Sequence, residues 1–506
     1  MRSMLASHTV WAKQIMIAVE SFLLDPLQEG TLQHRIRQMV AEGILSGRLR
    51  AGERMPSSRK LAAHLGVSRI TVTLAYAELV ADDFLHAEGR SGYFVSHTAP
   101  QPSKAGQCPA NDATTVDWVR MLGHRPPSGD LNRGKPRNWR EFRYPFIYGQ
   151  ADPSLFDHAN WRLCMIQSLG LKDFDRMTDD QFEQDDPGLL EYIARHSLPR
   201  RGILARPDEI LVTLGAQNAL WLAAQLLLNQ RRSAVIEEPG YPGLRDILTQ
   251  TRCRLVPVPV GSRGLLAEDL PAQLDVLFCT PSHHCPTGAT MPLDARHALL
   301  NAGQDRDFLI VEDDYEFEIA QGRAPLPALK SLDRSGRVIH VGSFSKSLFP
   351  GLRLGFMVGP APFIAEARAL RATVLRHPPG LLQRAAARFL SLGHYDVMLR
   401  RLSRSFASRR DVMLAAIRAE GLTLANTSEN GGSSLWMRTP DGVSATALTE
   451  ALKLQGVLIE RGLPFFGAVH APDCFYRIAY SSIASERIPE GISRIAHAIK
   501  TLQRTE

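Results

Sequence analysis

The stretch Ser343-Phe-Ser-Lys-Ser-Leu-Phe-Pro-Gly-Leu-Arg-Leu-Gly355 follows directly after the apolar run Val338-Ile-His-Val341. It places Lys346 in a hydroxyl-rich turn at the end of a predicted buried strand. A lysine there is costly unless it is neutralised, paired or used covalently, and Schiff-base formation with a carbonyl is one covalent use. The groups around it are those expected of a phosphate socket, two hydroxyls and one cation: Ser343, Ser345 and Arg353.

The composition indicates a soluble protein with more than one domain. A chain of 506 residues is too long for one ordinary core, and its 44% hydrophobic and 22% charged residues are typical of globular proteins. No apolar run approaches the length needed to cross a bilayer, and residues 1–13 lack the apolar core of a signal peptide. We therefore expect a cytoplasmic protein with no membrane partner. The six cysteines include no C-x-x-C pair, so we expect neither a disulfide framework nor a metal site.

The positive charge is concentrated towards the start of the chain. Residues 1–145 carry +6 of the net charge of +7, which leaves +1 for residues 146–506. This asymmetry is a weak indication of a polyanionic partner, because basic linkers also occur as solvated coil.

Residues 31–97 have the pattern of a winged helix-turn-helix. A helix is predicted from Thr31 to Gly47, a short helix ends at Gly66, and a third helix begins at Ser68. Two short strands, 84–86 and 93–95, follow and complete the motif as a hairpin. The residues expected on the buried face of the first helix are Leu32, Ile36, Met39, Val40, Ile44 and Leu45. Those expected on the buried face of the third helix are Val72, Ala75, Tyr76, Leu79 and Val80.

The third helix carries polar side chains near its N-terminus, where a recognition helix meets base edges and phosphates. Arg90, between two glycines at the tip of the hairpin, suits a wing that reaches a minor groove or a phosphate, although a lone exposed arginine is more often simply solvated. The run from Met55 to Leu79 and the segment Gly89-Arg-Ser-Gly-Tyr-Phe-Val95 resemble the GntR family of DNA-binding domains. The resemblance implies contacts with double-stranded DNA from Arg59, Ser68, Arg69, Thr71, Arg90 and Gly92.

Residues 98–145 are rich in Pro, Gly, Asn, Asp and Arg and have no apolar periodicity, so we predict a linker. Its charge fits contact with the DNA backbone and fits a plain solvated tether equally well. From residue 146 onward, short apolar runs alternate with helical stretches, which predicts an α/β sheet with helices on both faces. The predicted strands are 210–213, 233–236, 254–260, 276–280, 308–311, 338–341 and 354–359. The predicted domains are 25–97, 98–145 and 146–506.

Chemically active residues follow several of these strands, at the edge where such sheets bind ligands. Gly215-Ala-Gln217 opens a helix, whose N-terminal amides and dipole favour a phosphate. Glu238-Pro-Gly-Tyr241 supplies an aromatic ring, and Ile310-Val-Glu-Asp-Asp-Tyr315 supplies a pair of carboxylates and a phenol. The segment Thr280-Pro-Ser-His-His-Cys-Pro-Thr-Gly288 is a predicted turn after the strand 276–280. Arg477 lies on a further predicted strand near the C-terminus.

Together with Lys346, these motifs resemble the fold-type I aminotransferases that use pyridoxal phosphate, in the form found in MocR/GabR regulators. The resemblance implies that Lys346 forms the Schiff base with the cofactor. It also implies that Asp313 pairs with the pyridine nitrogen, with Asp314 as the alternative, and that Tyr315 hydrogen-bonds the 3'-oxygen. The further cofactor contacts that it implies are ring stacking by Tyr241 and phosphate binding by Gly215, Ala216, Gln217, Ser343 and Arg353.

Two positions bear on the chemistry of the implied site. Arg477 is implied to clamp an anionic group, a carboxylate or sulfonate, on an incoming amine. Aminotransferases that turn over usually have asparagine before the proline of the Pro-Thr-Gly turn, and this chain has Cys285 there. We therefore expect no efficient enzyme, and at most a weak aminotransferase-like half-reaction.

These features predict a DNA-binding transcription regulator that depends on pyridoxal phosphate. A small amine would displace Lys346 by forming an external aldimine and so move the domains between DNA-binding states. The resemblance implies γ-aminobutyrate, taurine, ectoine-derived diamino acids or the cofactor itself as effectors, and a head-to-tail homodimer. The alternative is an active aminotransferase that also binds DNA. A third hypothesis, a cofactor-free scaffold, is disfavoured by the complete set of Lys346, Asp313, Tyr315 and Arg353.

Overall fold

The structure of the chain is a computed structural model. It describes residues 17–24, 30–89, 91–99, 116–122, 136, 138–150, 152–319, 326–426, 432–467 and 471–504. The chain divides at residue 123 into two compact units, which we describe one at a time. Within the described ranges, no helix is both long and apolar enough to cross a membrane.

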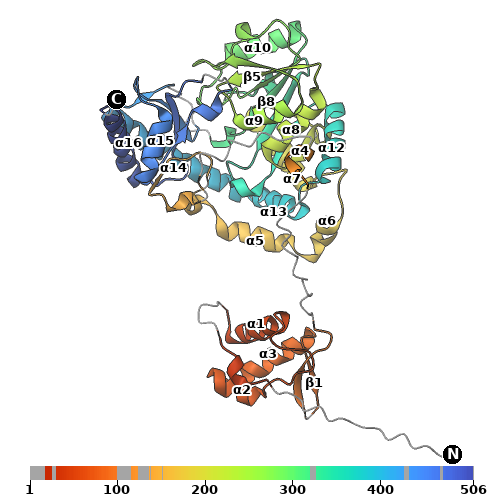
Figure 1. The fold of residues 1–506 in the computed structure, drawn as a ribbon. Coiled ribbons are helices and arrows are strands. Elements are labelled where there is room, and N and C mark those ends of the chain that lie inside the picture. Colours follow the sequence, from red (N-terminus) through yellow and green to blue (C-terminus); the bar gives the residue numbers. More distant parts are fainter. Residues whose placement is uncertain are drawn as a thin grey trace, which may run out of the picture. The chain divides into compact units, whose positions relative to one another are not determined.

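The first unit is a winged helix-turn-helix, as its sequence predicts (Figure 1). Its elements are α1 (Leu32–Leu45), α2 (Ser58–Leu65), α3 (Arg69–Ala81), β1 (Leu85–Glu88) and β2 (Gly92–Val95). The hydroxyl oxygens of Thr31 and Ser68 cap α1 and α3, and each accepts a hydrogen bond from a backbone N–H in the first turn. Gly66 ends α2 in the left-handed conformation, with φ 67°. Local capping and turn chemistry therefore determine where the three helices begin and end.

The core of the first unit differs from the prediction at its margins. Ile36, Val72 and Tyr76 are fully buried, as expected. Leu32 and Leu45 were expected on the buried face of α1, but both are exposed. They stand at the two ends of the helix, and neither belongs to the set of residues that pack the core of this unit. Val80 is only half-buried, near the C-terminal end of α3.

The described part of the second unit contains a seven-stranded sheet, and all seven predicted strands are confirmed. The strand order is β4-β10-β9-β8-β7-β5-β6, and β10 alone runs antiparallel to its neighbours. The strands are β4 (Ile210–Thr213), β5 (Ser233–Glu238), β6 (Arg254–Pro259), β7 (Val276–Cys279), β8 (Leu309–Asp314), β9 (Val338–Ser343) and β10 (Gly355–Val358).

Helices cover both faces of this sheet (Figure 1). One face packs against α8 (Gly215–Leu227), α9 (Pro242–Gln250) and α12 (Ala361–Leu375). On the other face, α10 (Leu293–Asp305) and α11 (Leu329–Leu332) cover strands β5 to β9. The remaining part of that face joins a larger core that includes α5 (His158–Ser168), α7 (Pro187–Tyr192), α13 (Gly380–Ser391) and α14 (His394–Ala419). The second unit also contains the short helix α6 (Phe174–Thr178), whereas the short helix α4 (Trp118–Met121) belongs to the first unit.

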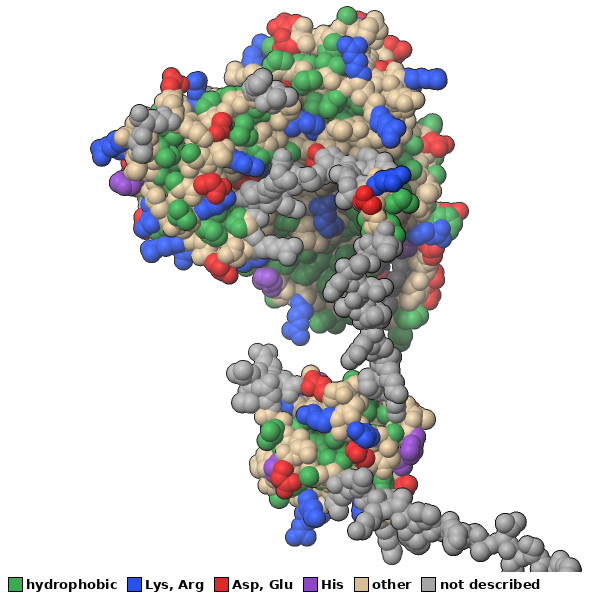
Figure 2. All heavy atoms as spheres, viewed as in Figure 1, with side chains coloured by type: hydrophobic (Ala, Val, Ile, Leu, Met, Phe, Trp, Pro, Cys, Tyr) green, Lys and Arg blue, Asp and Glu red, His purple; other side chains and the backbone are tan. Residues whose placement is uncertain are grey.

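A smaller antiparallel sheet lies towards the C-terminus, with strand order β11-β12-β15-β14. Its strands are β11 (Thr423–Leu424), β12 (Ser434–Arg438), β14 (Glu460–Arg461) and β15 (Phe475–Ala479). α15 (Ala445–Leu454) and α16 (Ile488–Gln503) pack against it in the larger core. β3 (Tyr144–Pro145), at the end of the stretch predicted as a linker, pairs with β13 (Val457–Leu458). On the face shown in Figure 2, the second unit carries basic and acidic side chains intermixed, in keeping with its small net charge.

Candidate functional site

Lys346 lies three residues beyond the end of β9 and is half-buried. Its Nζ atom is 4.1 Å from the centroid of the Tyr148 ring. Gly149 adopts φ +74°, and a Cβ atom added there would lie only 2.3 Å from the Nζ atom. The left-handed backbone favours glycine at 149, and any larger residue there would displace the end of the lysine side chain. The segment that contains Tyr148 and Gly149 thus brings an aromatic ring and a residue without a side chain beside Lys346.

The strand register brings the predicted phosphate-binding residues together. Gly355 in β10 pairs with Thr213 on one side and with Ser343 on the other. Gly215, two residues beyond Thr213, therefore lies at the same edge as Ser343, and a Cβ atom on Gly355 would be 2.9 Å from the Gly215 carbonyl carbon. Arg353, which precedes β10, lies at this edge as well, since its Nη2 atom is 3.2 Å from the position that a Cβ on Gly215 would occupy.

This edge presents hydrogen-bond donors and a cation. No side chain caps the N-terminus of α8, where Ala216 is half-buried and Gln217 is exposed. The Ser343 hydroxyl oxygen accepts a hydrogen bond from the backbone N–H of Ser345 at 3.2 Å. The Ser345 hydroxyl is buried and has no hydrogen-bond partner among the described residues. Uncapped helix amides, hydroxyls and a guanidinium at one place are suited to a phosphate.

The two adjacent aspartates of β8 have different surroundings. Asp314 is buried and accepts a hydrogen bond from Nε of Arg201 at 2.6 Å, so its charge is compensated within the fold. Asp313 is also buried, but its Oδ1 atom has no hydrogen-bond partner among the described residues. Burial, reinforced by the carboxylates of Asp314 and Glu237, raises the pKa of Asp313 to about 8. The Oδ1 atom of Asp314 also has no hydrogen-bond partner among the described residues, so the Arg201 ion pair is what distinguishes the two carboxyl groups, and Asp313 stays the predicted partner of a ligand.

Two aromatic rings lie near Asp313. Tyr241 lines one hollow with Asp313, Phe278 and Thr280. Tyr315 is half-buried, and both tyrosines pack against the apolar cluster that contains Cys285. Burial raises the pKa of Tyr241 to about 12 and that of Cys285 to about 11, so both groups stay protonated at neutral pH.

Arg477 lies in β15 and is only 5% exposed. Its Nε donates to Glu460 at 2.8 Å, and its Nη1 points to the Cys285 sulfur at 3.8 Å. The guanidinium carbon is 4.2 Å from the centroid of the Tyr148 ring and 4.7 Å from that of Phe465. Lys346 and Arg477 are therefore neighbours of one and the same ring, Tyr148. Sequence reasoning identified both cations but missed Tyr148 and Glu460, since neither carries a local motif.

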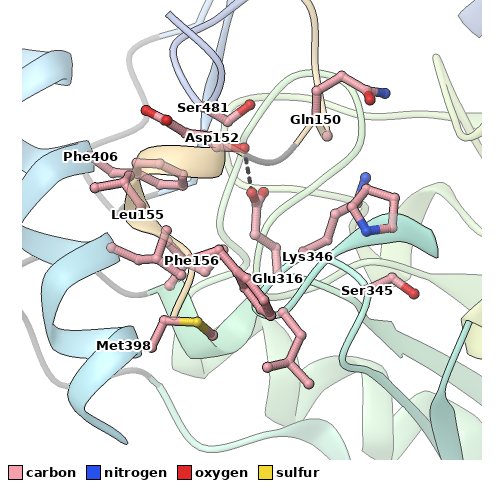
Figure 3. A pocket seen from close by; sticks show the side chains of 16 residues that line it. Gln150, Asp152, Leu155, Phe156, Glu316, Ser345, Lys346, Met398, Phe406 and Ser481 are labelled. Carbon is pink, nitrogen blue, oxygen red and sulfur yellow. Dashed lines mark hydrogen bonds between the residues drawn. The ribbon is translucent and has the colours of Figure 1, made fainter. Parts of the chain in front are cut away.

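A hollow beside Lys346 is shown in Figure 3. Met398 and Phe406 project into it from α14, and Gln150, Glu316 and Ser345 are among its polar lining residues. Glu316 accepts a hydrogen bond from the Ser433 hydroxyl, and its other carboxylate oxygen is 3.4 Å from Nε2 of His283. Sequence reasoning did not select Glu316 or His283. The hollow therefore offers polar groups to whatever occupies the space beside the lysine.

The predicted DNA contacts lie in the first unit. Arg59 is exposed on α2, and Arg69 is exposed at the start of α3. The Ser68 hydroxyl accepts from the backbone N–H of Thr71 at 3.1 Å, so it acts as the cap of the helix. Gly92, at the start of β2, has φ +109° and permits the sharp return of the hairpin. The remaining prediction, Arg90, lies outside the described residues.

Two family models match this chain. Residues 32–95 match bacterial regulatory proteins of the gntR family, and residues 186–495 match aminotransferases of class I and II. The HTH-type transcriptional regulator TauR of Rhodobacter capsulatus is 57% identical over 484 residues, which cover 96% of this chain and 100% of that protein. The probable rhizopine catabolism regulatory protein MocR of Rhizobium meliloti is 30% identical over 485 residues, which cover 95% and 96%.

The chain belongs to the MocR/GabR subfamily of GntR transcription regulators. Its GntR domain is a DNA-binding domain, and its larger domain has the fold of class I and II aminotransferases. Pyrococcus horikoshii kynurenine aminotransferase, solved with PMP, matches with a TM-score of 0.70 and 25% identity over 77% of this chain and 99% of that one. Thermus thermophilus LysN, solved with a phosphopyridoxyl-leucine compound, matches with a TM-score of 0.67 and 28% identity over 77% and 100%.

The cofactor of this domain in the MocR/GabR subfamily is pyridoxal phosphate, and the described residues fit it. The fit rests on three observations of this chain: the Asp313 oxygen without a partner, the buried Ser345 hydroxyl without a partner, and the space that Gly149 leaves at the lysine nitrogen. When bound, the cofactor supplies an aldehyde for amines and an electron-withdrawing ring.

Proposed function

We propose that this regulator senses a small amine with an anionic end, of the taurine class, which takes the place of Lys346 on the aldehyde of pyridoxal phosphate. The observation that carries the proposal is the position of Lys346 and Arg477 beside the same ring, at 4.1 and 4.2 Å from the Tyr148 centroid. One short molecule can therefore present its amine where Lys346 acts and its anion to Arg477. This pairing of amine chemistry with an anion clamp selects a class of ligand rather than a single compound.

We propose the cofactor roles that the family resemblance implies, and the surroundings of Asp313 and Tyr241 support two of them. Asp313 holds the pyridine nitrogen, because Asp314 already serves Arg201. Tyr241 stacks on the ring, since it lines the same hollow as Asp313, and Tyr315 donates to the 3'-oxygen. The residues that bind the phosphate are Gly215, Ala216, Gln217, Ser343 and Arg353.

The surroundings of Arg477 favour a short ligand. The guanidinium is bounded by the rings of Tyr148 and Phe465 and by the Cys285 sulfur, while Glu460 holds its Nε. A long ligand would have to displace one of these buried groups. The 57% identity to the regulator named TauR makes taurine, a two-carbon aminosulfonate, the first effector to test.

The organisation that accompanies this function is a DNA-binding domain at 25–97, a linker at 98–145 and a sensor domain at 146–506. We propose a cytoplasmic head-to-tail homodimer, in which effector binding changes the affinity for operator DNA through a difference in binding energy between two states. Cys285, which stays protonated beside Arg477, stands where an asparagine would assist turnover, so the site binds its amine without efficient transamination.

The test is a titration of the purified holoprotein with taurine, β-alanine, γ-aminobutyrate and ethanolamine, followed by visible absorption and by fluorescence anisotropy on operator DNA. Ethanolamine is the control, since it has an amine but no anion. We expect taurine to shift the cofactor band lastingly and to change DNA affinity, and ethanolamine to do neither at the same concentration. A band that bleaches and is restored by a keto acid would instead indicate an aminotransferase. A protein that pyridoxal phosphate cannot reconstitute would refute the proposal.

A further inference from the structure

The outward side of the recognition helix α3 is unusually apolar. Ile70 is 71% exposed and Leu74 is 48% exposed, and their four-residue spacing places them on the same side of the helix. Ala77 is exposed one turn further along. The opposite side of the helix contains Val72 and Tyr76, which are fully buried in the core of the first unit. A helix that is apolar on both sides is typical of a helix that is covered on both sides.

The polar side chains on this part of α3 are engaged within the helix itself. Thr73 is exposed, but its hydroxyl donates to the Arg69 carbonyl at 2.9 Å and so is already engaged within the helix. The Ser68 hydroxyl caps the helix, and it also lies 2.8 Å from the hydroxyl of Thr71. What the surface offers to a partner is therefore mostly methyl groups, with the guanidinium of Arg69 at one end.

The charges identify the partner as a polyanion. Arg59 and Lys60 on α2 and Arg69 on α3 are exposed, and α3 contains no acidic residue before Glu78. Figure 2 shows a face of the first unit on which basic side chains lie among hydrophobic and acidic ones. A protein partner for an apolar ridge would not require this concentration of cations, whereas the phosphates of DNA do. The gntR-family match to residues 32–95 points to the same partner.

We propose that Ile70, with Leu74 one turn further along, reads the methyl groups of thymine in the major groove. A recognition helix of this motif places its N-terminal residues against base edges there. The C5 methyl of thymine is the apolar group on those edges, and aliphatic side chains contact it. The operator half-site therefore carries thymine at the positions that face Ile70 and Leu74, next to the base or phosphate that Arg69 binds. The argument for this contact does not depend on which amine the second unit binds.

The test begins with selection of duplexes from a randomised library by the full-length holoprotein, so that no operator has to be assumed. Each thymine of the selected half-site is then replaced by uracil, which removes only the methyl group, and affinity is measured by fluorescence anisotropy at fixed salt. We expect one or two positions in each half-site at which uracil weakens binding roughly four-fold, the effect of losing one buried methyl group. With Ile70→Ala, the ratio of thymine to uracil affinity at one of these positions should fall to about one.

Leu45→Ala is the matched control, because Leu45 is an exposed leucine of the same unit that lies at the end of α1. It should leave both the affinity and the thymine-to-uracil ratios unchanged. Thermal unfolding of Ile70→Ala should match that of the native chain, since the side chain is exposed and alanine favours helix. A selected site with no thymine in the protected major groove would overturn the proposal. Uracil effects that Ile70→Ala does not alter would also overturn the proposal. A change in the oligomeric state of the DNA-free Ile70→Ala protein would overturn it too, because it would show that a protein surface covers Ile70.

Discussion

Replacing Asp313 by asparagine is expected to stabilise the cofactor-free protein. The pKa of Asp313 rises from 3.8 to about 8 in the folded chain, mainly because the carboxyl is buried. The folded state thus keeps a proton that the unfolded chain has lost, so the free energy of unfolding falls as the pH rises from about 4 to about 8. At 1.36 kcal/mol for each pKa unit, the shift of about 4 units amounts to a loss of roughly 6 kcal/mol above pH 8. Asparagine has nearly the same shape and cannot ionise, so it avoids this loss.

Asp314 provides the matched control, because it is the next residue of the same strand. Its carboxylate is paired with the buried Arg201, so Asp314→Asn removes the partner of a buried charge. Breaking such a pair typically costs about 3–5 kcal/mol. Two substitutions that look alike in the sequence are therefore expected to act in opposite directions.

The assay is urea unfolding of the cofactor-free native, Asp313→Asn and Asp314→Asn proteins between pH 5 and pH 8.5. The advantage of Asp313→Asn over the native protein should be about 2 kcal/mol at pH 5 and should grow to about 5–6 kcal/mol at pH 8.5. Adding pyridoxal phosphate at pH 8.5 should stabilise the native protein more than Asp313→Asn, because the pyridine nitrogen gives the carboxylate a partner. An Asp313→Asn protein that is less stable than the native protein at pH 8.5 would refute the reasoning.

Two further substitutions test the geometry around Lys346. Gly149→Ala should displace the lysine nitrogen, which would lie 2.3 Å from the new Cβ, and should therefore weaken the visible absorption of the holoprotein. Gly393→Ala also has a positive φ, +78°, but its Cβ would meet open space, so it should lose about 1 kcal/mol of stability and keep the absorption. Arg477→Met should destabilise the protein by about 3–5 kcal/mol, because it removes the cation that is paired with the buried Glu460 carboxylate. The double variant Arg477→Met/Glu460→Gln should recover most of that stability in denaturant unfolding. It should not recover taurine binding. Recovery of taurine binding in the double variant would show that Arg477 is not the anion clamp.

The fold was predictable because its signals are local. Alternation of short apolar runs with helical stretches gave all seven strands of the large sheet, and Thr31, Gly66 and Ser68 marked the ends of helices. The periodicity could not show that Leu32 and Leu45 are exposed, because it extends to the helix ends whereas the packing of the core does not. The apolar periodicity of α1 does not show how far along the helix the neighbouring elements pack against it.

Candidate site residues could be selected from the sequence where they form one contiguous motif after a strand, as they do around Lys346. It was not predictable where the role of a residue depends on a distant partner. The difference between Asp313 and Asp314 is made by Arg201, more than a hundred residues away in the chain. Tyr148 gains its role only because the N-terminal segment of the second unit lies beside both Lys346 and Arg477. Such contacts form only in the tertiary structure, so they produce no motif that can be recognised in the sequence.

The recognition helix shows a second way in which a functional residue escapes sequence reasoning. An apolar residue in a helix is assigned to the core by default, so the polar residues Ser68, Arg69 and Thr71 were selected as DNA contacts and Ile70 was not. The structure places Val72 inside and Ile70 outside, although both are aliphatic and only two positions apart. Exposure of a large aliphatic side chain is unfavourable in the free protein and becomes favourable only when a partner covers it. In the complex that we propose, the methyl group of thymine provides that cover, so the exposed isoleucine would add sequence information to any that its polar neighbours read.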